Sequence, residues 1–248
     1  MNRVHANMKL SDLVESNFEL ISVIQRLEIP YGFKEKTIER VCNENGIDVN
    51  FFLHLAQWFN DRHYSPEEHL IKHSPLWLIV YLRNTHHCYL TYQIPRIEKE
   101  ITLLEENKDL SDQTVKLLIK FFREYINEFT AHISEEEVRT FPYTIDLIDT
   151  LNDKMSLDEF HAKYQGYTID SYLEGHSDLD EKVNDLRNLL LKHIPPIVGN
   201  CHFSNLLLEL FRLGKDLRDH TVLEENVLIP IVRKKEQELI IKIKNSKK

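Results

Sequence analysis

Hydrophobic side chains recur every three or four residues along most of the chain, the spacing of one face of an α-helix. Stepping alternately three and four residues gives four such stripes, within residues 76–104, 115–136, 172–190 and 203–227. A stripe of this kind is buried when several helices pack side by side. The pattern therefore predicts an all-α fold, an antiparallel four-helix bundle.

The four stripes are apolar except for histidines, glutamates and one arginine. Their members are Leu76, Val80, Arg83, His87, Leu90, Ile94, Ile97, Ile101 and Leu104; Val115, Leu118, Phe122, Tyr125, Phe129, His132 and Glu136; Tyr172, His176, Leu179, Val183, Leu186 and Leu190; and Phe203, Leu206, Leu210, Leu213, Leu217, His220, Glu224 and Val227. Each predicted helix thus carries at least one polar side chain into the core.

The chain before the bundle has shorter apolar runs and predicts helices at 10–27, 36–45 and 49–60, with Ser11 and Asp48 as N-caps. A polar segment with two prolines follows. We predict a small helical N-terminal domain at 1–62, a linker at 63–75 and the bundle at 76–248. Short helices covering one end of the bundle are expected within 140–166.

Composition supports helices, because the 248 residues include only six Gly and eight Pro. A formal charge of −9 disfavours nucleic acid or an acidic membrane as partner. The three cysteines form no CxxC pair, which argues against a disulfide framework and a cysteine zinc site. Without a signal-peptide pattern or a run of about 18 apolar residues, we expect a cytoplasmic protein.

One motif occurs twice, as "HISEEEVRTFP" from His132 and as "HTVLEENVLIP" from His220. In each, Glu follows His by four residues (Glu136 and Glu224), so the two side chains are neighbours on one helix face. A buried carboxylate or imidazole is costly without a partner. Repetition on the core stripes makes an ordinary surface His–Glu pair a poor explanation and favours a shared metal site.

The ligand count indicates two metal ions, with histidines as nitrogen donors and the two glutamates as bridges. The predicted set is His87, His132, His176, His220, Glu136 and Glu224. This donor set suits iron, manganese or zinc. His87 is selected over His86 because His86 lies about 100° around the helix from the stripe. Glu128, one turn before His132, is either a proton relay or a solvated helix glutamate.

These segments, with "THHCYLTYQIP" and "GHSDLDEKVNDLR", resemble the hemerythrin-like di-iron domain of iron–sulfur cluster repair proteins, the RIC family. The resemblance implies two non-haem Fe ions, oxo- and carboxylate-bridged, on the same six residues. It also implies a role in repairing iron–sulfur clusters damaged by oxidative or nitrosative stress, through NO reduction or iron release. O2 or NO would be small ligands, damaged iron–sulfur proteins partners, and a homodimer one assembly.

Residues 36–48 resemble the small N-terminal domain of the same family, but "IPYGFKE" at 29–35 stands where the family commonly carries Cys-Cys-Gly-Gly. Three functions stay open at this point. The chain is a di-iron oxidoreductase of the NO-reductase kind, an O2 or NO carrier or sensor without turnover, or a metal-free helical interaction protein.

Overall fold

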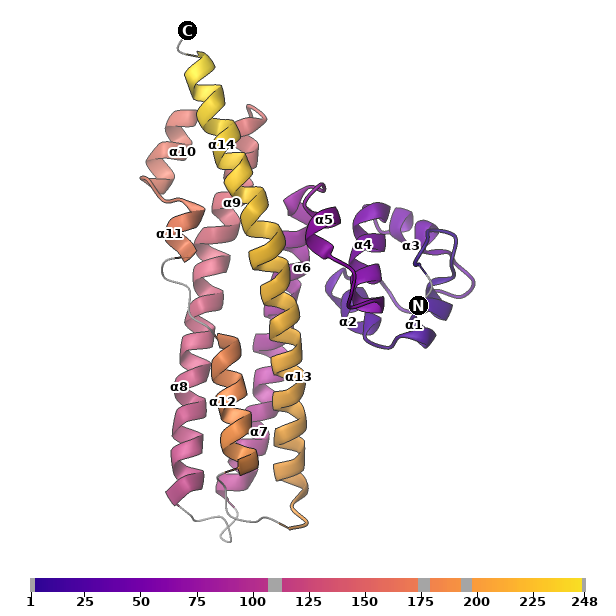
Figure 1. Cartoon of the computed structure of the whole chain (residues 1–248), viewed down its shortest axis with the longest axis vertical. Helices are drawn as coiled ribbons and strands as arrows, with labels where there is room; N and C mark the ends of the chain where they lie inside the picture. The colour runs from indigo at the N-terminus through magenta and orange to yellow at the C-terminus, as the bar shows by residue number, and fades with distance from the viewer. Residues whose placement is uncertain (1–2, 107–112, 174–178, 193–197, 247–248) are drawn as a thin grey trace. The chain divides into compact units, whose positions relative to one another are not determined.

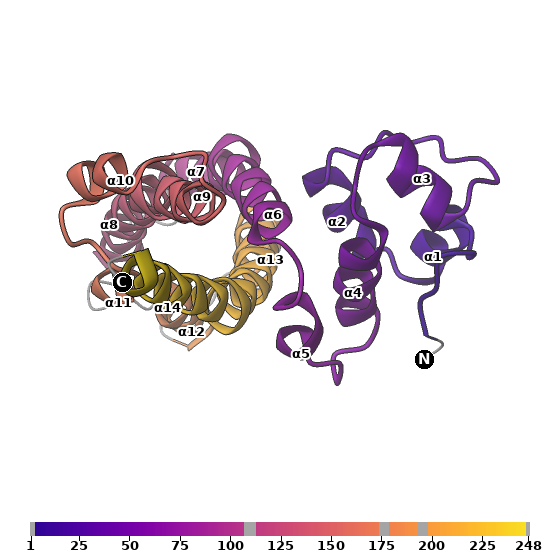
Figure 2. The ribbon, with the colours of Figure 1, turned by 90° about the horizontal axis from the view of Figure 1, so that it is seen from above.

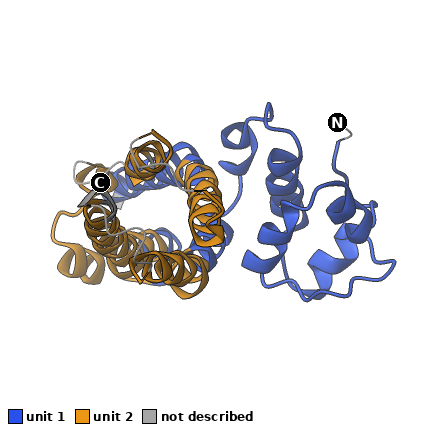
Figure 3. Ribbon diagram, turned by 90° about the horizontal axis from the view of Figure 1, so that it is seen from below, with its two compact units in different colours: residues 1–85, 147–154, 222–248 blue, residues 86–146, 155–221 orange. Residues whose placement is uncertain are grey.

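The computed structural model describes residues 3–106, 113–173, 179–192 and 198–246, and this part of the chain forms helices and no strands (Figure 1). The all-α prediction is confirmed. The chain divides into two compact units, coloured in Figure 3: unit 1 is 1–85, 147–154 and 222–248, and unit 2 is 86–146 and 155–221. Within the described ranges, no helix combines the length and apolar character of a membrane span.

Unit 2 contains the bundle. Its long helices are α7 (Ile94–Glu105), α8 (Gln113–Glu135), α12 (Leu179–Lys192) and α13 (Cys201–Leu223), which lie side by side in Figures 1 and 2. Neighbouring helices run in opposite directions (Figure 1). One continuous apolar core joins them, and it includes Ile97, Phe122, Phe129, Val183 and Leu213. Burial of these faces supplies the main stabilisation of the bundle.

The stripes predicted for the second, third and fourth helices are confirmed at the apolar positions whose side chains are described. Phe122, Tyr125, Phe129, Tyr172, Leu179, Val183, Leu186, Leu190, Leu206, Leu210, Leu213, Leu217 and Val227 are all buried, and Phe203 packs against them while partly exposed. The side chains of Val115, Leu118 and His176 lie outside the described residues.

Three π-helical turns interrupt the described helices: η1 (Tyr89–Gln93), η3 (Glu136–Thr140) and η4 (Glu224–Leu228). Each begins six residues before a proline, namely Pro95, Pro142 and Pro230. Proline has no N–H and cannot close the α-helical bond to the residue four before it. A π turn, whose hydrogen bonds run from i to i+5, in effect adds one residue to the helix.

The first stripe is wrong before η1 for this reason. Ile94, Ile97, Ile101 and Leu104 are buried as predicted, whereas Leu76 and Val80 are exposed. The extra residue in η1 rotates the preceding helix α6 (Pro75–Cys88) by one position relative to a regular helix. The buried side chains of α6 therefore include Leu78, Leu82, Thr85 and His86, and the buried face continues to Tyr89 in η1.

Shorter helices occupy the segment after η3, as expected. They are α9 (Phe141–Leu151), α10 (Leu157–Tyr164) and α11 (Ile169–Leu173). Ser156 and Glu159 form a capping box that starts α10, and α10 ends at Gln165 in the left-handed conformation, with φ of 42°. The turn that follows leads into α11, which carries Tyr172.

In unit 1 the N-terminal helices are α1 (Leu10–Ser16), α2 (Leu20–Arg26), α3 (Ile38–Glu44), α4 (Val49–Asn60) and α5 (Pro66–Leu70). The single helix predicted at 10–27 breaks at Asn17, whose amide donates to the Phe59 carbonyl and whose side-chain oxygen accepts from the Glu19 N–H. The Asp48 N-cap is confirmed, since it accepts from the Phe51 N–H at 2.8 Å. The prediction of Ser11 as an N-cap is wrong, because α1 begins at Leu10 and Lys9 occupies the N-cap position.

Unit 1 also contains most of α6 and the C-terminal helix α14 (Ile229–Ser246). The Arg26 guanidinium donates to the Tyr81 hydroxyl at 3.0 Å, and the Asn84 amide donates to the Arg26 carbonyl at 2.6 Å, so α2 is tied to α6. The segment predicted as a linker, 63–75, includes helix α5 with Leu70 buried. The predicted domain boundaries remain predictions.

Candidate metal centre

The buried carboxylate of Glu136 is the centre of the site. Glu136 is the first residue of η3, directly after α8, and is 0% exposed. An ionised carboxylate at such a position requires charged or hydrogen-bonding partners on both oxygens. The partners come from elements far apart in the sequence.

One oxygen of this carboxylate, Oε1, faces His132 and Tyr172. The His132 Nε2 lies 2.9 Å from Oε1, one helical turn earlier on α8. The Tyr172 hydroxyl, from α11, donates to the same oxygen at 2.6 Å. The predicted His132–Glu136 pair is thus formed, and the Tyr172 hydroxyl is added to it.

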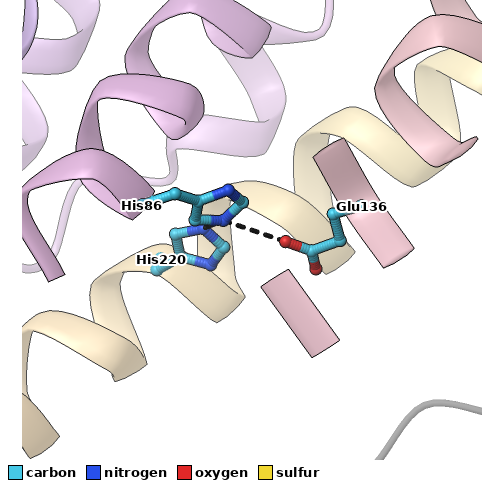
Figure 4. A group of neighbouring side chains, drawn as sticks. All are labelled: His86, Glu136 and His220. Carbon is cyan, nitrogen blue, oxygen red and sulfur yellow. Dashed lines mark hydrogen bonds and ion pairs between the residues drawn. The ribbon is translucent and has the colours of Figure 1, made fainter. Parts of the chain in front are cut away.

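The other oxygen, Oε2, faces two further histidines. His86 Nε2 lies 2.9 Å from Oε2 and 2.8 Å from His220 Nε2. Candidate ligand atoms of His86, Glu136 and His220 all lie within 4.8 Å of one another, and all three side chains are buried. Figure 4 shows the two imidazoles and the carboxylate pointing toward one another from separate helices. Glu136 therefore presents each of its oxygens to a different set of histidines.

Burial and charge act in opposite directions on these groups. Burial alone would lower the pKa of His86, but its close contacts with the carboxylates of Glu136 and Glu137 outweigh that effect and raise the pKa to about 9. Burial alone would raise the pKa of Glu136, but its close contacts with His132 and His86 hold it well below its ordinary value. In the metal-free protein the pair is an imidazolium and a carboxylate.

The residues present fit a metal cation. Glu136 Oε2 is buried and receives no well-aligned hydrogen bond among the described residues, although His86 Nε2 is within ion-pair distance. Two imidazole Nε2 atoms at 2.8 Å from each other share a single proton between them at most. Imidazole nitrogens and a carboxylate oxygen converging on one point are the donor set that iron, manganese and zinc accept.

The three remaining predicted ligands are Glu224, His176 and His87, and the outcome of the prediction differs among them. Glu224, the first residue of η4, is buried, and the helix runs without a break from His220 to Glu224, so the two side chains share one face. His176 lies outside the described residues. His87 is exposed. The choice of His87 over His86 was therefore wrong, because the π turn η1 places His86 on the buried face.

A signal for His86 was present in the sequence. The pentapeptides "TYQIP", "VRTFP" and "NVLIP" each end in a proline that lies six residues after the first residue of a π turn. Counting the buried face of α6 backward from Tyr89 instead of Leu90 gives His86. Glu137 was not predicted as a partner of the site, because it is not a member of the apolar stripe. Its Oε1 accepts a hydrogen bond from His86 Nδ1 at 2.8 Å.

Glu128 does not enter the buried site. It is exposed, because Phe129 takes the core position on this turn of α8, and its carboxylate pairs with Lys182. Glu128 instead lines a cavity of about 860 Å³, together with His132, Arg139, Tyr167, Tyr172 and Lys182. This cavity adjoins the His132 side of Glu136, so the solvated-glutamate alternative describes Glu128 better than the relay.

The sequence of the chain was compared with known protein families and with curated proteins. The family model described as Hemerythrin HHE cation binding domain matches residues 78–232, which is more than half of the chain and contains His86, His132, Glu136, His220 and Glu224. No curated protein sequence matches the chain closely enough to count as a relative.

Proposed function

The chain belongs to the hemerythrin HHE cation-binding domain family, and we propose that it is a cytoplasmic non-haem di-iron protein that acts in the repair of iron–sulfur clusters. The coarser statement, a helical-bundle protein that binds metal through histidine and glutamate, follows from family membership and from the cluster around Glu136. The identity and number of the ions, and the reaction, are the proposal.

A single observation carries the di-iron assignment. Glu136 Oε1 lies against His132, while Oε2 lies against His86, which in turn meets His220. A carboxylate whose two oxygens serve different sets of nitrogen donors is suited to bridging two cations. A mononuclear site would need only one of these sets.

Each residue would have a defined task. His86 and His220 would hold one ion and His132 the other, with Glu136 between them. We propose Glu224 as a second carboxylate ligand, since it shares the helix face of His220, and His176 as a further nitrogen donor. The Tyr172 hydroxyl keeps Glu136 Oε1 oriented. When bound, a ferrous pair would supply electrons for NO reduction, and release of iron from the same site is the other route to repair.

The cavity beside His132 supports access of a small molecule. Its volume of about 860 Å³ far exceeds the size of a diatomic gas, and Tyr172 belongs both to its wall and to the hydrogen bonds of Glu136. A ligand that enters there would approach the centre from the Oε1 side.

The test is metal analysis with optical spectroscopy of anaerobically purified protein, before and after NO and then O2. The proposal predicts two irons per chain, loss of both in the Glu136→Ala, Glu224→Ala double variant, and catalytic production of N2O if the enzyme is an NO reductase. The Glu135→Ala variant, at an exposed neighbour of Glu136, is the matched control and should retain both irons. Protein that binds no transition metal after reconstitution with ferrous iron would contradict the proposal.

A second function, reversible O2 or NO binding without turnover, is favoured by the N-terminal helices. The stretch 29–35 has no cysteine, and Cys42 is buried, which raises its thiol pKa to about 12. A thiol with that pKa is a poor nucleophile and a poor redox relay at neutral pH. Fast gas binding that reverses on removal of the gas, with no N2O formed, would favour the carrier or sensor.

A further inference from the structure

The two copies of the repeated motif each carry a second glutamate directly after the ligand glutamate, and the fold uses these two residues differently. Glu137 in the first copy lies 2.8 Å from His86 Nδ1. Glu225 in the second copy is exposed on η4. The two positions therefore differ in burial, because Glu137 is partly buried.

The His86 ring is held from three directions. Its Nε2 edge points to Glu136 and His220, the proposed metal position. Its face stacks on Phe141, with ring centroids 5.5 Å apart and planes 13° from parallel. Its Nδ1 edge donates to Glu137, on the side opposite the proposed metal. The ring is 2% exposed, so few other groups compete for these contacts.

We propose that Glu137 is the positioning residue of the metal centre: its carboxylate holds the Nδ1–H of His86 and so presents the Nε2 lone pair to the cation. This inference rests on the proposed metal site. A metal-bound imidazole normally donates its second N–H to a carboxylate or carbonyl, which fixes the tautomer and ring orientation and makes the nitrogen a stronger donor. Glu137 meets that requirement with a charged acceptor.

The consequence is that one segment, η3, acts on both edges of the His86 ring. Consecutive residues of η3, Glu136 and Glu137, contact opposite edges of one imidazole. The first copy of the motif therefore supplies a ligand and also orients a histidine from another helix. The second copy supplies His220 and Glu224, and its Glu225 lies at the surface.

The test compares Glu137→Leu, Glu137→Gln and the matched control Glu225→Leu. Metal-free full-length protein is titrated with Zn²⁺ and, anaerobically, with Fe²⁺ in competition with a chromophoric chelator. Loss of the carboxylate partner of a ligand histidine typically weakens metal binding by about 10–100-fold, and we expect this for Glu137→Leu. Glu137→Gln keeps a neutral acceptor and should recover most of the affinity, while Glu225→Leu should stay within about 2-fold of the unmodified protein.

A second measurement uses unmodified protein and does not depend on the variants folding. In the Zn²⁺-loaded form, nitrogen-resolved NMR should find the His86 proton on Nδ1 and slow to exchange, as a hydrogen bond to Glu137 requires. A His86 proton on Nε2 would overturn the proposal. So would a Glu137→Leu variant that binds both ions as tightly as Glu225→Leu. Unmodified protein that binds neither ion would overturn the proposed function itself, which is a different result from equal binding by all variants.

Discussion

At the scale of single residues, two buried tyrosine hydroxyls differ in the charge of their hydrogen-bond partner. The Tyr172 hydroxyl donates to a buried carboxylate at 2.6 Å, whereas the Tyr167 hydroxyl, also buried, pairs with the neutral Thr140 hydroxyl at 3.0 Å. A hydrogen bond to a charged group contributes about 1.5–3 kcal/mol and a neutral one about 0.5–1.5 kcal/mol. The two tyrosines therefore form a matched pair.

We predict that Tyr172→Phe lowers the free energy of unfolding of the metal-free protein by about 1.5–3 kcal/mol, and Tyr167→Phe by about 0.5–1.5 kcal/mol. Denaturant unfolding, followed by circular dichroism, measures both values. Equal losses in the two variants would contradict the assignment of a charged acceptor to Tyr172.

A pH dependence follows from His86. Burial lowers the pKa of His86, but its close contacts with the carboxylates of Glu136 and Glu137 outweigh burial and raise it from 6.5 to about 9. Because the folded state binds the His86 proton more tightly than the unfolded state, protonated His86 contributes its full stabilisation below pH 6.5. This contribution is lost as the pH rises through about 9. Glu136, whose pKa is lowered, stays ionised throughout this range. The pKa shift of His86 corresponds to a contribution of about 3 kcal/mol at most to the free energy of unfolding.

The metal-free protein should therefore lose stability between pH 6.5 and 9, and the His86→Gln variant should lose much less over the same range. His87→Gln, a change at the exposed neighbour, serves as the control and should retain the slope of the unmodified protein. Denaturation midpoints at several pH values give the result. A slope in His86→Gln as steep as in the control would refute the assignment.

At the scale of helices, the sequence predicted the buried faces where the helix is regular and failed where it is not. Phe122 to Phe129 and Leu206 to Leu217 follow the three-four spacing and are buried at the expected positions. The face of α6 was displaced by one residue because a periodic count assumes 3.6 residues per turn, and η1 departs from that value. The same cause places His86, and not His87, on the buried face beside Glu136. The acceptor role of Glu137 depends on the contact between η3 and His86, which no pattern within one helix contains.

If η1 holds one extra residue, deleting one there should be tolerated. We predict that removal of Thr91, an exposed residue of η1, converts the turn to regular helix while leaving the faces on both sides in place. The cost should be below about 2 kcal/mol, and His86 should keep its place beside Glu136. Thermal unfolding and zinc content of the variant measure the two effects.

The matched deletion is Lys99, also exposed but within the regular helix α7. Its removal rotates Ile101 and Leu104, both buried, by about 100° toward solvent. Exposing two such side chains costs about 3–6 kcal/mol. If the two deletions destabilised the protein equally, η1 would not contain an inserted residue.

At the scale of the whole chain, unit 2 gathers His86, Glu136 and His220 from positions up to 134 residues apart. A cation bound by all three would add a link between helices that an apolar core and ion pairs such as Arg96–Glu209 already join. Binding to the folded state only stabilises it by RT ln(1 + [L]/Kd), about 2.7 kcal/mol at 100 times Kd. Metal should therefore raise the stability of the protein, and a chelator should lower it.

The response of the fold to added metal separates a metal protein from a helical interaction protein. Replacing His132 and His220 with Leu removes a partner from the buried Glu136 carboxylate, so the metal-free variant should be less stable than the unmodified metal-free protein. With metal present, the unmodified protein should gain the stabilisation that metal binding to the folded state supplies, and the double variant should gain none. Thermal midpoints with excess Zn²⁺ and with chelator give all four values. A zinc-induced rise of the same size in both proteins would place the bound ion elsewhere, whereas a rise confined to the unmodified chain assigns it to the histidines around Glu136.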